Sequence, residues 1–405
     1  MSKALRNRWK RICAMLLAAA MVITMMPSTA MAGTSSDLGD GTFQNPVIYS
    51  DVPDLDMIRV GDAYYMISTT MHLSPGCPVM KSTDLVNWEI VNYVFDRLGT
   101  DDAMSLRNGK NMYGNGQWAA SLQYHDGLYY VAFNSNTTGR AYIYTTDDIE
   151  RGSWTKRDLG APYHDMALFF DDNGKTYILY GGTQIRCVEL EEDLSGAKPG
   201  TEVILFDSNA AGEEVNASDK GFILGYEGTH ILKKDGYYYV FNICWPNGAG
   251  RTEVCHRSRT FPTTEWENKV ILQANFSNFG TSAGVAQGGV IDTPDGKWYG
   301  FLFQDHGAIG RVPVLTDCTW KEGWPMLGKN GDGKTVEAVM QIPVAGSSTK
   351  SIVKSDEFYN DAEHREYAAA ANAVSEAEAE AASVASDAAA NASEPAPAAE
   401  SAAGT

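Results

Sequence analysis

Lys234-Asp-Gly236-Tyr-Tyr-Tyr-Val-Phe-Asn242 is a polar turn followed by alternating aromatic and aliphatic residues. The phrase recurs as Gly61-Asp-Ala-Tyr64-Tyr65, Gly127-Leu-Tyr-Tyr130, Gly174-Lys-Thr-Tyr177 and Gly296-Lys-Trp-Tyr299. The five turn glycines are separated by 66, 47, 62 and 60 residues. Such a turn before an alternating run is typical of a tight hairpin entering a buried strand. Apolar segments upstream complete each hairpin: 56–60, 120–124, 167–170, 229–233 and 289–292.

A second element follows the hairpin in three of the units. It consists of a predicted strand, a turn and a tryptophan that would pack between the unit and its neighbour, a tryptophan plug. The three segments are 82–88, 145–154 and 257–266. No convincing helix pattern occurs between Gly41 and Val344. Five all-β units of about 60 residues fit a radial array of four-stranded sheets better than a sandwich, which has no reason to repeat its hairpin. The sequence therefore predicts an all-β, five-bladed β-propeller over residues 41–355.

Both ends of the 405-residue chain differ from this pattern. Residues 1–32 carry five basic side chains, an apolar run of about 14 residues and Ala30-Met-Ala32, which predicts a signal peptide and hence a secreted, extracellular protein. The run is shorter than the ~20 residues that cross a bilayer. Residues 33–40 are expected to be a short linker. Residues 356–405, rich in Ala, Ser and Glu, predict an acidic, disordered, low-complexity tail.

Charge and cysteine content narrow the possible partners. The chain has 32 basic and 51 acidic side chains, a formal charge of −19, which repels nucleic acid and anionic lipid. We therefore expect no nucleic-acid partner, and no membrane association after signal cleavage. Five cysteines remain beyond the leader, an odd number without a C-x-x-C motif, so a cysteine zinc site is disfavoured. Buried free thiols are expected, and only Cys244 and Cys255 are close enough in sequence to suggest a disulfide within a hairpin.

Counting back from the turn glycines gives one equivalent position in each unit. In four units this position lies nine residues before the turn glycine, and in the first unit, whose turn is shorter, it lies seven residues before it. The five residues are Asp54, Trp118, Asp165, Glu227 and Gln287. If the units superimpose, these residues form a ring around the axis at one end of the innermost strands. We call them the ring positions. Three units therefore supply carboxylates to one central cavity.

Three carboxylates around a cavity suit glycoside hydrolysis, in which one acid protonates the leaving oxygen and another carboxylate activates water or attacks the sugar. A third acid nearby raises the proton donor's pKa by like-charge repulsion. Trp118 would supply a flat apolar wall and Gln287 a hydrogen-bond partner for the sugar. Two alternatives stay open: the acids cap loops or bind Ca²⁺, or Asp51 or Asp56 replaces Asp54, which the ring position favours.

Three motifs carry a family resemblance: Asn45-Pro46 with Val52-Pro-Asp54, His164-Asp165 with Leu168-Phe-Phe170, and Glu227-Gly-x-His230. Together they resemble glycoside hydrolase family 43 from about residue 41 to 343. The resemblance implies a five-bladed propeller and hydrolysis with inversion at the anomeric carbon. It implies that Asp54 is the general base, Asp165 the pKa-modulating acid and Glu227 the general acid.

Further stretches, 68–76, 81–92 and 303–311, resemble the branch with β-xylosidase and α-L-arabinofuranosidase activity. By this resemblance the side chains of His72 and Trp118 would flank the sugar at the cleavage site, and Arg311 would contact the substrate. His306 would lie on the axis beneath the sugar, where relatives often hold Ca²⁺ or a water cluster. A hydrogen-bonded core histidine is the alternative for His306, so a structural Ca²⁺ is possible and no other cofactor is expected.

The expected function is exo-hydrolysis of terminal α-L-arabinofuranosyl or β-D-xylosyl residues from hemicellulose-derived oligosaccharides or polysaccharides. Lys354-Ser-Asp-Glu-Phe358 resembles the junction where such relatives begin a C-terminal β-sandwich, but low-complexity sequence follows here. Two interpretations fit this difference. The acceptor side of the active site is more open than in the relatives, or the chain is a truncated family member with weakened activity. The rival from another class is a carbohydrate-binding propeller without catalysis. The asymmetry of the ring, with Asp, Trp, Asp, Glu and Gln, favours chemistry at one central site.

Overall fold

The computed structural model describes residues 36–345 except 213, 216–220 and 275–283, and also residue 352. The predicted leader and tail lie outside the described residues. The strands group into four-stranded antiparallel sheets, each formed by four strands consecutive in the chain. Blade I comprises β2 (Asp56–Val60), β3 (Ala63–Ile67), β4 (Gly76–Ser82) and β5 (Glu89–Phe95). Blade II comprises β6 (Gln117–His125), β7 (Leu128–Ser135), β8 (Arg140–Thr146) and β9 (Thr155–Asp158).

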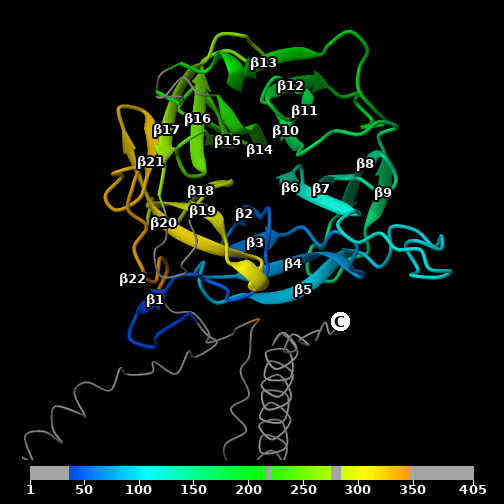
Figure 1. Cartoon of the computed structure of the whole chain (residues 1–405), viewed down its shortest axis with the longest axis horizontal. Coiled ribbons are helices and arrows are strands. Elements are labelled where there is room, and N and C mark those ends of the chain that lie inside the picture. The colour runs from blue at the N-terminus through cyan, green and yellow to red at the C-terminus, as the bar shows by residue number, and fades with distance from the viewer. Residues whose placement is uncertain (1–35, 213, 216–220, 275–283, 346–351, 353–405) are drawn as a thin grey trace, which may run out of the picture. The chain divides into compact units, whose positions relative to one another are not determined.

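The other three blades repeat this order. Blade III comprises β10 (Ala167–Phe170), β11 (Thr176–Tyr180), β12 (Gln184–Glu189) and β13 (Val203–Asp207). Blade IV comprises β14 (Phe222–Lys234), β15 (Tyr237–Pro246), β16 (Thr252–Ser258) and β17 (Glu267–Leu272). Blade V comprises β18 (Gly288–Asp292), β19 (Trp298–Asp305), β20 (Arg311–Lys321) and β21 (Trp324–Leu327). The inner strands β2, β6, β10, β14 and β18 contact one another in turn, and β18 returns to β2 (Figure 1). The fold is thus the predicted five-bladed β-propeller.

Glycine supplies the tight turns that the repeat predicted. Each of the five turn glycines has φ between +62°, at Gly61, and +82°, at Gly296, in the left-handed region that other residues avoid. The turns lie between the first and second strand of every blade. Each inner strand therefore starts at the end of the propeller opposite these turns, which places the ring positions together at that end.

The interface between each pair of neighbouring blades contains a cluster of buried apolar side chains, in the part of the chain that the structure describes. The predicted tryptophan plugs are confirmed, because Trp88, Trp154 and Trp266 each pack into the cluster shared with the preceding blade. Burial of apolar area stabilises by about 25 cal/mol per Å², so these clusters stabilise the contacts between neighbouring blades. The clusters hold the blades around one axis.

A short sheet joins the two ends of the propeller. Strand β1 (Thr42–Gln44) pairs antiparallel with β22 (Val339–Gln341). Asn45 adds two hydrogen bonds to blade V, where its side-chain amide donates to the Leu315 carbonyl at 2.8 Å and its side-chain oxygen accepts from the Leu315 N–H at 3.0 Å. The segment before blade I is thereby tied to the last blade, which closes the ring.

All five cysteines in the described residues are buried free thiols. Cys244 lies opposite Thr252 and Cys255 opposite Phe241, so the two cysteines are out of register for a disulfide across β15 and β16. Burial raises the pKa of each thiol, which keeps it protonated and unreactive. Helical structure in the described chain is limited to the short 3-10 turns η1 (Ser208–Ala210) and η3 (Gly307–Ile309), and no described helix could cross a membrane.

Blade IV buries His256 without a hydrogen-bond partner for either ring nitrogen among the described residues. Its ring stacks on Phe206, with centroids 3.8 Å apart, and meets Tyr226 edge-on. Burial lowers the pKa of His256 to about 3. An unfolded histidine takes up a proton below pH ~6.5, so unfolding is favoured progressively as the pH falls from about 6.5 towards 3.

We expect the substitution His256→Phe to weaken this acid sensitivity, because a phenyl ring keeps the stack and does not titrate. The loss of unfolding free energy between pH 7 and pH 5 should be smaller than in the wild type by about 2 kcal/mol, at 1.36 kcal/mol per pH unit. Urea unfolding at the two pH values measures the difference. Equal losses in both proteins would contradict the assignment.

Candidate active site

The structure brings the ring positions together at one end of the axis. Asp54 and Asp165 each stand two residues before the inner strand of their blade, Gln287 stands immediately before β18, and Trp118 and Glu227 lie within β6 and β14. The Gly228 N–H donates to Asp165 Oδ2 at 3.2 Å, which joins blade IV to blade III. A Cβ atom on Gly228 would lie 2.3 Å from Cδ of Gln287, so only glycine leaves room for the blade V residue. The equivalence predicted from the repeat therefore holds in space.

Three ring residues share an unusual backbone conformation. Asp54, Asp165 and Gln287 have φ values of 52°, 46° and 46°. The left-handed region costs a non-glycine residue roughly 1–2 kcal/mol, and such strain is concentrated at functional sites. The same strained conformation just before the inner strand of three blades indicates a common way of presenting these side chains.

Asp165 has the most perturbed carboxyl group of the ring. It is 7% exposed. Burial, the largest cause, and the negative charges of Glu227 and Asp54 raise its pKa to about 7, while His164 and the hydrogen bond from the Gly228 N–H act in the opposite direction. Like charges and desolvation both favour the protonated form of a carboxyl group. Asp165 therefore senses the charges of both other acids, which is the property expected of a modulating group.

His164 connects two of the acids, a role that the sequence did not reveal. Its Nε2 lies 3.5 Å from Glu227 Oε2, and its Nδ1 lies 3.7 Å from Asp165 Oδ1. The hydrogen bond to Glu227, followed by the charges of the three acids, raises the pKa of His164 against the effect of burial. The Trp118 ring lies beside it, with centroids 6.0 Å apart. The sequence had singled out His164 only as the residue before Asp165 in the family motif, without a role of its own.

On the other side of the ring, Arg311 pairs with Asp54. Its Nη1 donates to Asp54 Oδ1, and its Nε donates to Asp305 Oδ1 at 3.3 Å. Arg251 forms an ion pair with the other oxygen of Asp305 at 2.7 Å. The Phe303 ring lies 4.7 Å from the Arg311 guanidinium carbon. Arg311 thus orients the expected base, and the sequence had not indicated the supporting pair formed by Asp305 and Arg251.

The two acids that flank Asp54 have separate partners. Asp51 Oδ1 accepts a hydrogen bond from the Arg311 backbone N–H at 2.7 Å. Asp56 points below the ring, where its Oδ1 lies 3.5 Å from His230 Nε2 and its Oδ2 accepts from the Leu122 N–H at 2.7 Å. Asp54 is the one of the three at the ring position.

His72 lies in the loop after β3, at the same end as the ring. Backbone hydrogen bonds of 3.0 Å between Met71 and Gln117 align this loop with the start of β6, beside Trp118. The His72 ring packs edge-on against Tyr113, with centroids 4.8 Å apart. A cavity of about 280 Å³ opens between this loop and the long connection from β5 to β6, lined by His72, Ser74, Arg97, Leu98, Gly99, Met104, Ser105 and Met112.

His306 lies elsewhere than expected. It follows β19, a second strand, and precedes η3, so it is not on an innermost strand. Its Nε2 is 3.4 Å from the Tyr49 hydroxyl group, towards the surface. The histidine beneath the ring is instead His230 of β14. The family motif predicted that His306 lies on the axis. In the structure Gly288, the first residue of β18, pairs with Leu302 of β19. His306 follows Leu302 by four residues and therefore lies beyond the level of the ring positions.

One group of residues in the described part of the chain could hold a metal ion: His164, Asp165 and Glu227, whose ligand atoms lie within 4.8 Å of one another. Ca²⁺ takes six to eight oxygen ligands, whereas this group offers an imidazole and two carboxylates. His306 is not part of the group. The residues found here therefore do not make the oxygen-rich cage that the expected calcium would need.

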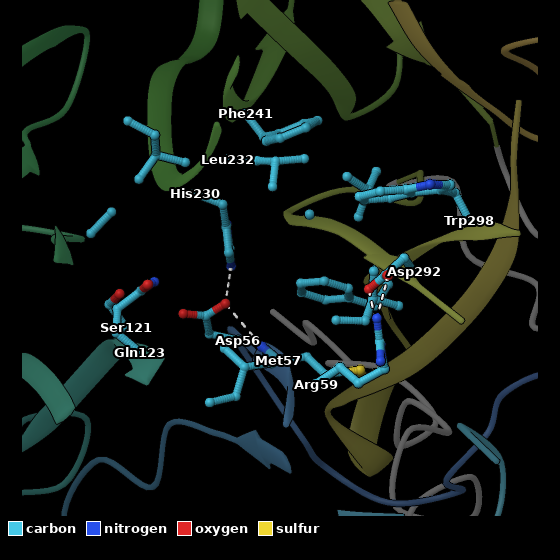
Figure 2. A pocket seen from close by; sticks show the side chains of 17 residues that line it. Asp56, Met57, Arg59, Ser121, Gln123, His230, Leu232, Phe241, Asp292 and Trp298 are labelled. Carbon is cyan, nitrogen blue, oxygen red and sulfur yellow. Dashed lines mark hydrogen bonds and ion pairs between the residues drawn. The ribbon is translucent and has the colours of Figure 1, made fainter. Parts of the chain in front are cut away.

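A cavity of about 230 Å³ lies on the axis, lined by residues of all five inner strands and by Phe241, Trp298 and Phe301 of the second strands β15 and β19 (Figure 2). Asp56 and His230 face one another across it. Arg59 forms an ion pair with Asp292, at 3.1 Å from Nε to Oδ1 and 2.5 Å from Nη2 to Oδ2. The axis thus carries two polar layers beyond the ring: the pair Asp56–His230 and the pair Arg59–Asp292.

Known proteins resemble this chain. A beta-xylosidase from Formosa agariphila is 31% identical over 75% of this chain and 53% of its own length. A non-reducing end alpha-L-arabinofuranosidase from Bacteroides ovatus is 29% identical over 73% of this chain and 55% of its own. A solved structure described as a bifunctional GH43-CE protein from Bacteroides eggerthii is 46% identical, with a TM-score of 0.70, over 78% of this chain and 38% of that one.

This chain therefore spans about half the length of these curated relatives. The sequence profile of the glycosyl hydrolases family 43 matches residues 43–325, which contain all five ring positions. With the propeller and its asymmetric ring of acids, this match shows that the chain belongs to glycosyl hydrolases family 43.

Proposed function

We propose that the protein is a secreted, inverting exo-glycosidase that releases terminal α-L-arabinofuranosyl or β-D-xylosyl residues from hemicellulose-derived saccharides. The observation that carries the proposal is the buried Asp165 carboxyl group, whose pKa is raised by burial and by the charges of Glu227 and Asp54. Membership of family 43 and relatives named beta-xylosidase and alpha-L-arabinofuranosidase support it. The leader-like residues 1–32 support secretion.

In the proposed reaction Glu227 gives its proton to the glycosidic oxygen as the bond from that oxygen to the anomeric carbon breaks. Asp54 takes a proton from a water molecule whose oxygen attacks the anomeric carbon from the opposite face. Inversion requires the two carboxyl groups to stand ~6.5–9.5 Å apart, which leaves room for this water. The proposed reaction needs no cofactor.

Each acid has a partner suited to its role. Arg311 holds the base Asp54 in one orientation. Asp165 accepts the N–H of Gly228, next to the acid Glu227, so the modulator is connected directly to the acid's backbone. Trp118, His72 and Gln287 would contact the sugar, and the 280 Å³ cavity beside His72 gives room for the leaving saccharide.

Substitution of the acid and the base should have different effects. Asp54→Asn removes the base, so we expect kcat to fall at least 10³-fold on both nitrophenyl glycosides and unsubstituted disaccharides. Glu227→Gln removes the acid, so the loss should be larger on disaccharides, because nitrophenolate leaves without protonation. Steady-state kinetics on paired arabinosides and xylosides measure both effects and reveal the preferred sugar.

Asp51→Asn is the matched control, because asparagine can still accept the Arg311 N–H. It should keep activity within a few fold. Full activity of Asp54→Asn or Glu227→Gln would exclude the assignment. Binding of arabinose or xylose without turnover by the wild type would instead indicate a carbohydrate-binding propeller.

The configuration of the first product provides a second test. Direct attack by water inverts the anomeric carbon, so a β-xyloside should give α-xylose before mutarotation. Proton NMR during the first minutes of hydrolysis distinguishes the anomers. Initial release of β-xylose would show retention and would contradict the role of Asp54 as a base.

The raised pKa of Asp165 predicts a change in the pH profile. With a pKa of about 7, the Asp165 carboxyl group changes its charge near neutral pH, beside Glu227 and Asp54. Asparagine does not titrate, so in Asp165→Asn the inflection that Asp165 gives to the alkaline limb of kcat/KM near pH 7 should be absent. Profiles between pH 4 and pH 9 test this, and an unchanged alkaline limb would contradict it.

A further inference from the structure

Beneath the ring, the His230 side chain connects two blades that are not neighbours. His230 belongs to β14 of blade IV, and its Nε2 lies 3.2 Å from the Leu55 carbonyl oxygen of blade I. Its Nδ1 lies 3.2 Å from the carbonyl oxygen of Gly228, in its own strand. Leu55 directly follows Asp54, and Gly228 directly follows Glu227. One imidazole ring therefore contacts the carbonyl oxygen of the residue after the expected base and that of the residue after the expected acid.

Both of these contacts require a proton on the histidine. A carbonyl oxygen only accepts hydrogen bonds, so each ring nitrogen has to donate. A neutral imidazole has one N–H, and the second contact would then set a nitrogen lone pair against a carbonyl oxygen. Both hydrogen bonds form together only in the imidazolium cation.

The charges around His230 suit a cation. Asp56 Oδ1 lies 3.5 Å from Nε2, and this carboxyl group is 7% exposed. The backbone N–H groups of Leu122 and Met57 donate to Asp56 at 2.7 and 2.8 Å, which fixes the carboxylate in place. From blade V, Phe301 meets the histidine ring edge-on, with centroids 5.8 Å apart.

The other charged residues in this cavity neutralise each other. Arg59 and Asp292 form their own ion pair, as Figure 2 shows. Asp56 is therefore the charged group that faces His230 within the cavity, and a buried charge needs such a partner.

The position of this contact bears on the separation of the two catalytic carboxyl groups. Asp54 and Glu227 come from blades I and IV, between which blade V intervenes. Small rotations of the blades about the axis would move the two acids relative to one another. An inverting glycosidase tolerates little change, because the separation has to admit one water molecule. A pair of charge-assisted hydrogen bonds from one ring to both backbones opposes such movement.

We propose that His230, as an imidazolium ion paired with Asp56, is a positioning residue that sets the distance between the carboxyl groups of Asp54 and Glu227. The catalytic part of this inference rests on the proposed function, whereas the charge state of His230 does not. His230 touches neither substrate nor reacting atoms in this scheme. It acts by holding the backbone segments that carry Asp54 and Glu227.

The protonation of His230 can be measured directly by NMR of the full chain labelled with ¹⁵N-histidine. His256 is an internal reference, because it is buried in the same blade and burial lowers its pKa to about 3, so that it is neutral at pH 7.5. The spectra of His230→Gln and His256→Gln assign the two rings. We expect both nitrogens of His230 to carry protons at pH 7.5 and His256 to show one protonated and one bare nitrogen. A neutral His230 at pH 7.5 would overturn the proposal.

Kinetics test what the cation does. Glutamine offers one donor group and one acceptor, so in His230→Gln an oxygen replaces one of the two donors. A displacement of about 1 Å at the reacting groups can cost 10²-fold in rate. We therefore expect kcat to fall about 100-fold, with KM within about twofold of the wild type, at a temperature where the variant is fully folded by circular dichroism. His256→Gln, the matched control, should lower the melting temperature and leave kcat unchanged.

The outcomes separate this inference from the proposed function. A kcat of His230→Gln within twofold of the wild type would overturn the positioning role, even if the proposed glycosidase activity is found. If the wild type hydrolyses neither arabinosides nor xylosides, the proposed function fails while the NMR measurement still decides the charge of His230. If His230→Gln does not fold, His230→Asn, which also replaces one of the two donors with an oxygen, takes its place in both the NMR assignment and the kinetics.

Discussion

Apolar side chains packed between neighbouring blades hold the five inner strands around one axis, and the site depends on this packing. No blade carries more than two of the groups that the proposed chemistry uses. Asp54 comes from blade I, Asp165 from blade III and Glu227 from blade IV. The three acids therefore come close together only in the closed propeller. The pairing of β1 with β22 and the hydrogen bonds of Asn45 complete that closure.

The same closure gathers groups that repel one another. Two of the three acids are less than a tenth exposed, and Asp165 shows the effect of burial and like charge in its raised pKa. Arg311 and His164 oppose the repulsion from opposite sides of the ring. Strained backbone at Asp54 and Asp165 adds a further cost. Such a cluster lowers stability, and the apolar interfaces between blades offset it.

The propeller axis is polar in layers. The ring of acids lies at one end, Asp56 and His230 lie beneath it, and Arg59 and Asp292 line the same cavity as that pair. Each lower layer joins different blades: I with IV, then I with V. Small residues at Gly228 and Gly289 leave room where the strands converge, because a side chain there would meet Gln287 or Phe301. The layers can therefore act on the geometry of the ring from below.

Local patterns in the sequence determined the blades and the ring positions. A turn glycine with positive φ and the alternation after it depend on neighbouring residues only, so five copies of the hairpin predicted the register that put Asp54, Asp165 and Glu227 at equivalent places. The tertiary structure alone decided the contacts of His164, His230, Asp305 and Arg251, and it moved His306 off the axis. These side chains are not at the repeated position. Their partners lie on other blades or on other strands of the same blade, so they depend on how the blades pack and on the exact register of second strands, which no local pattern records.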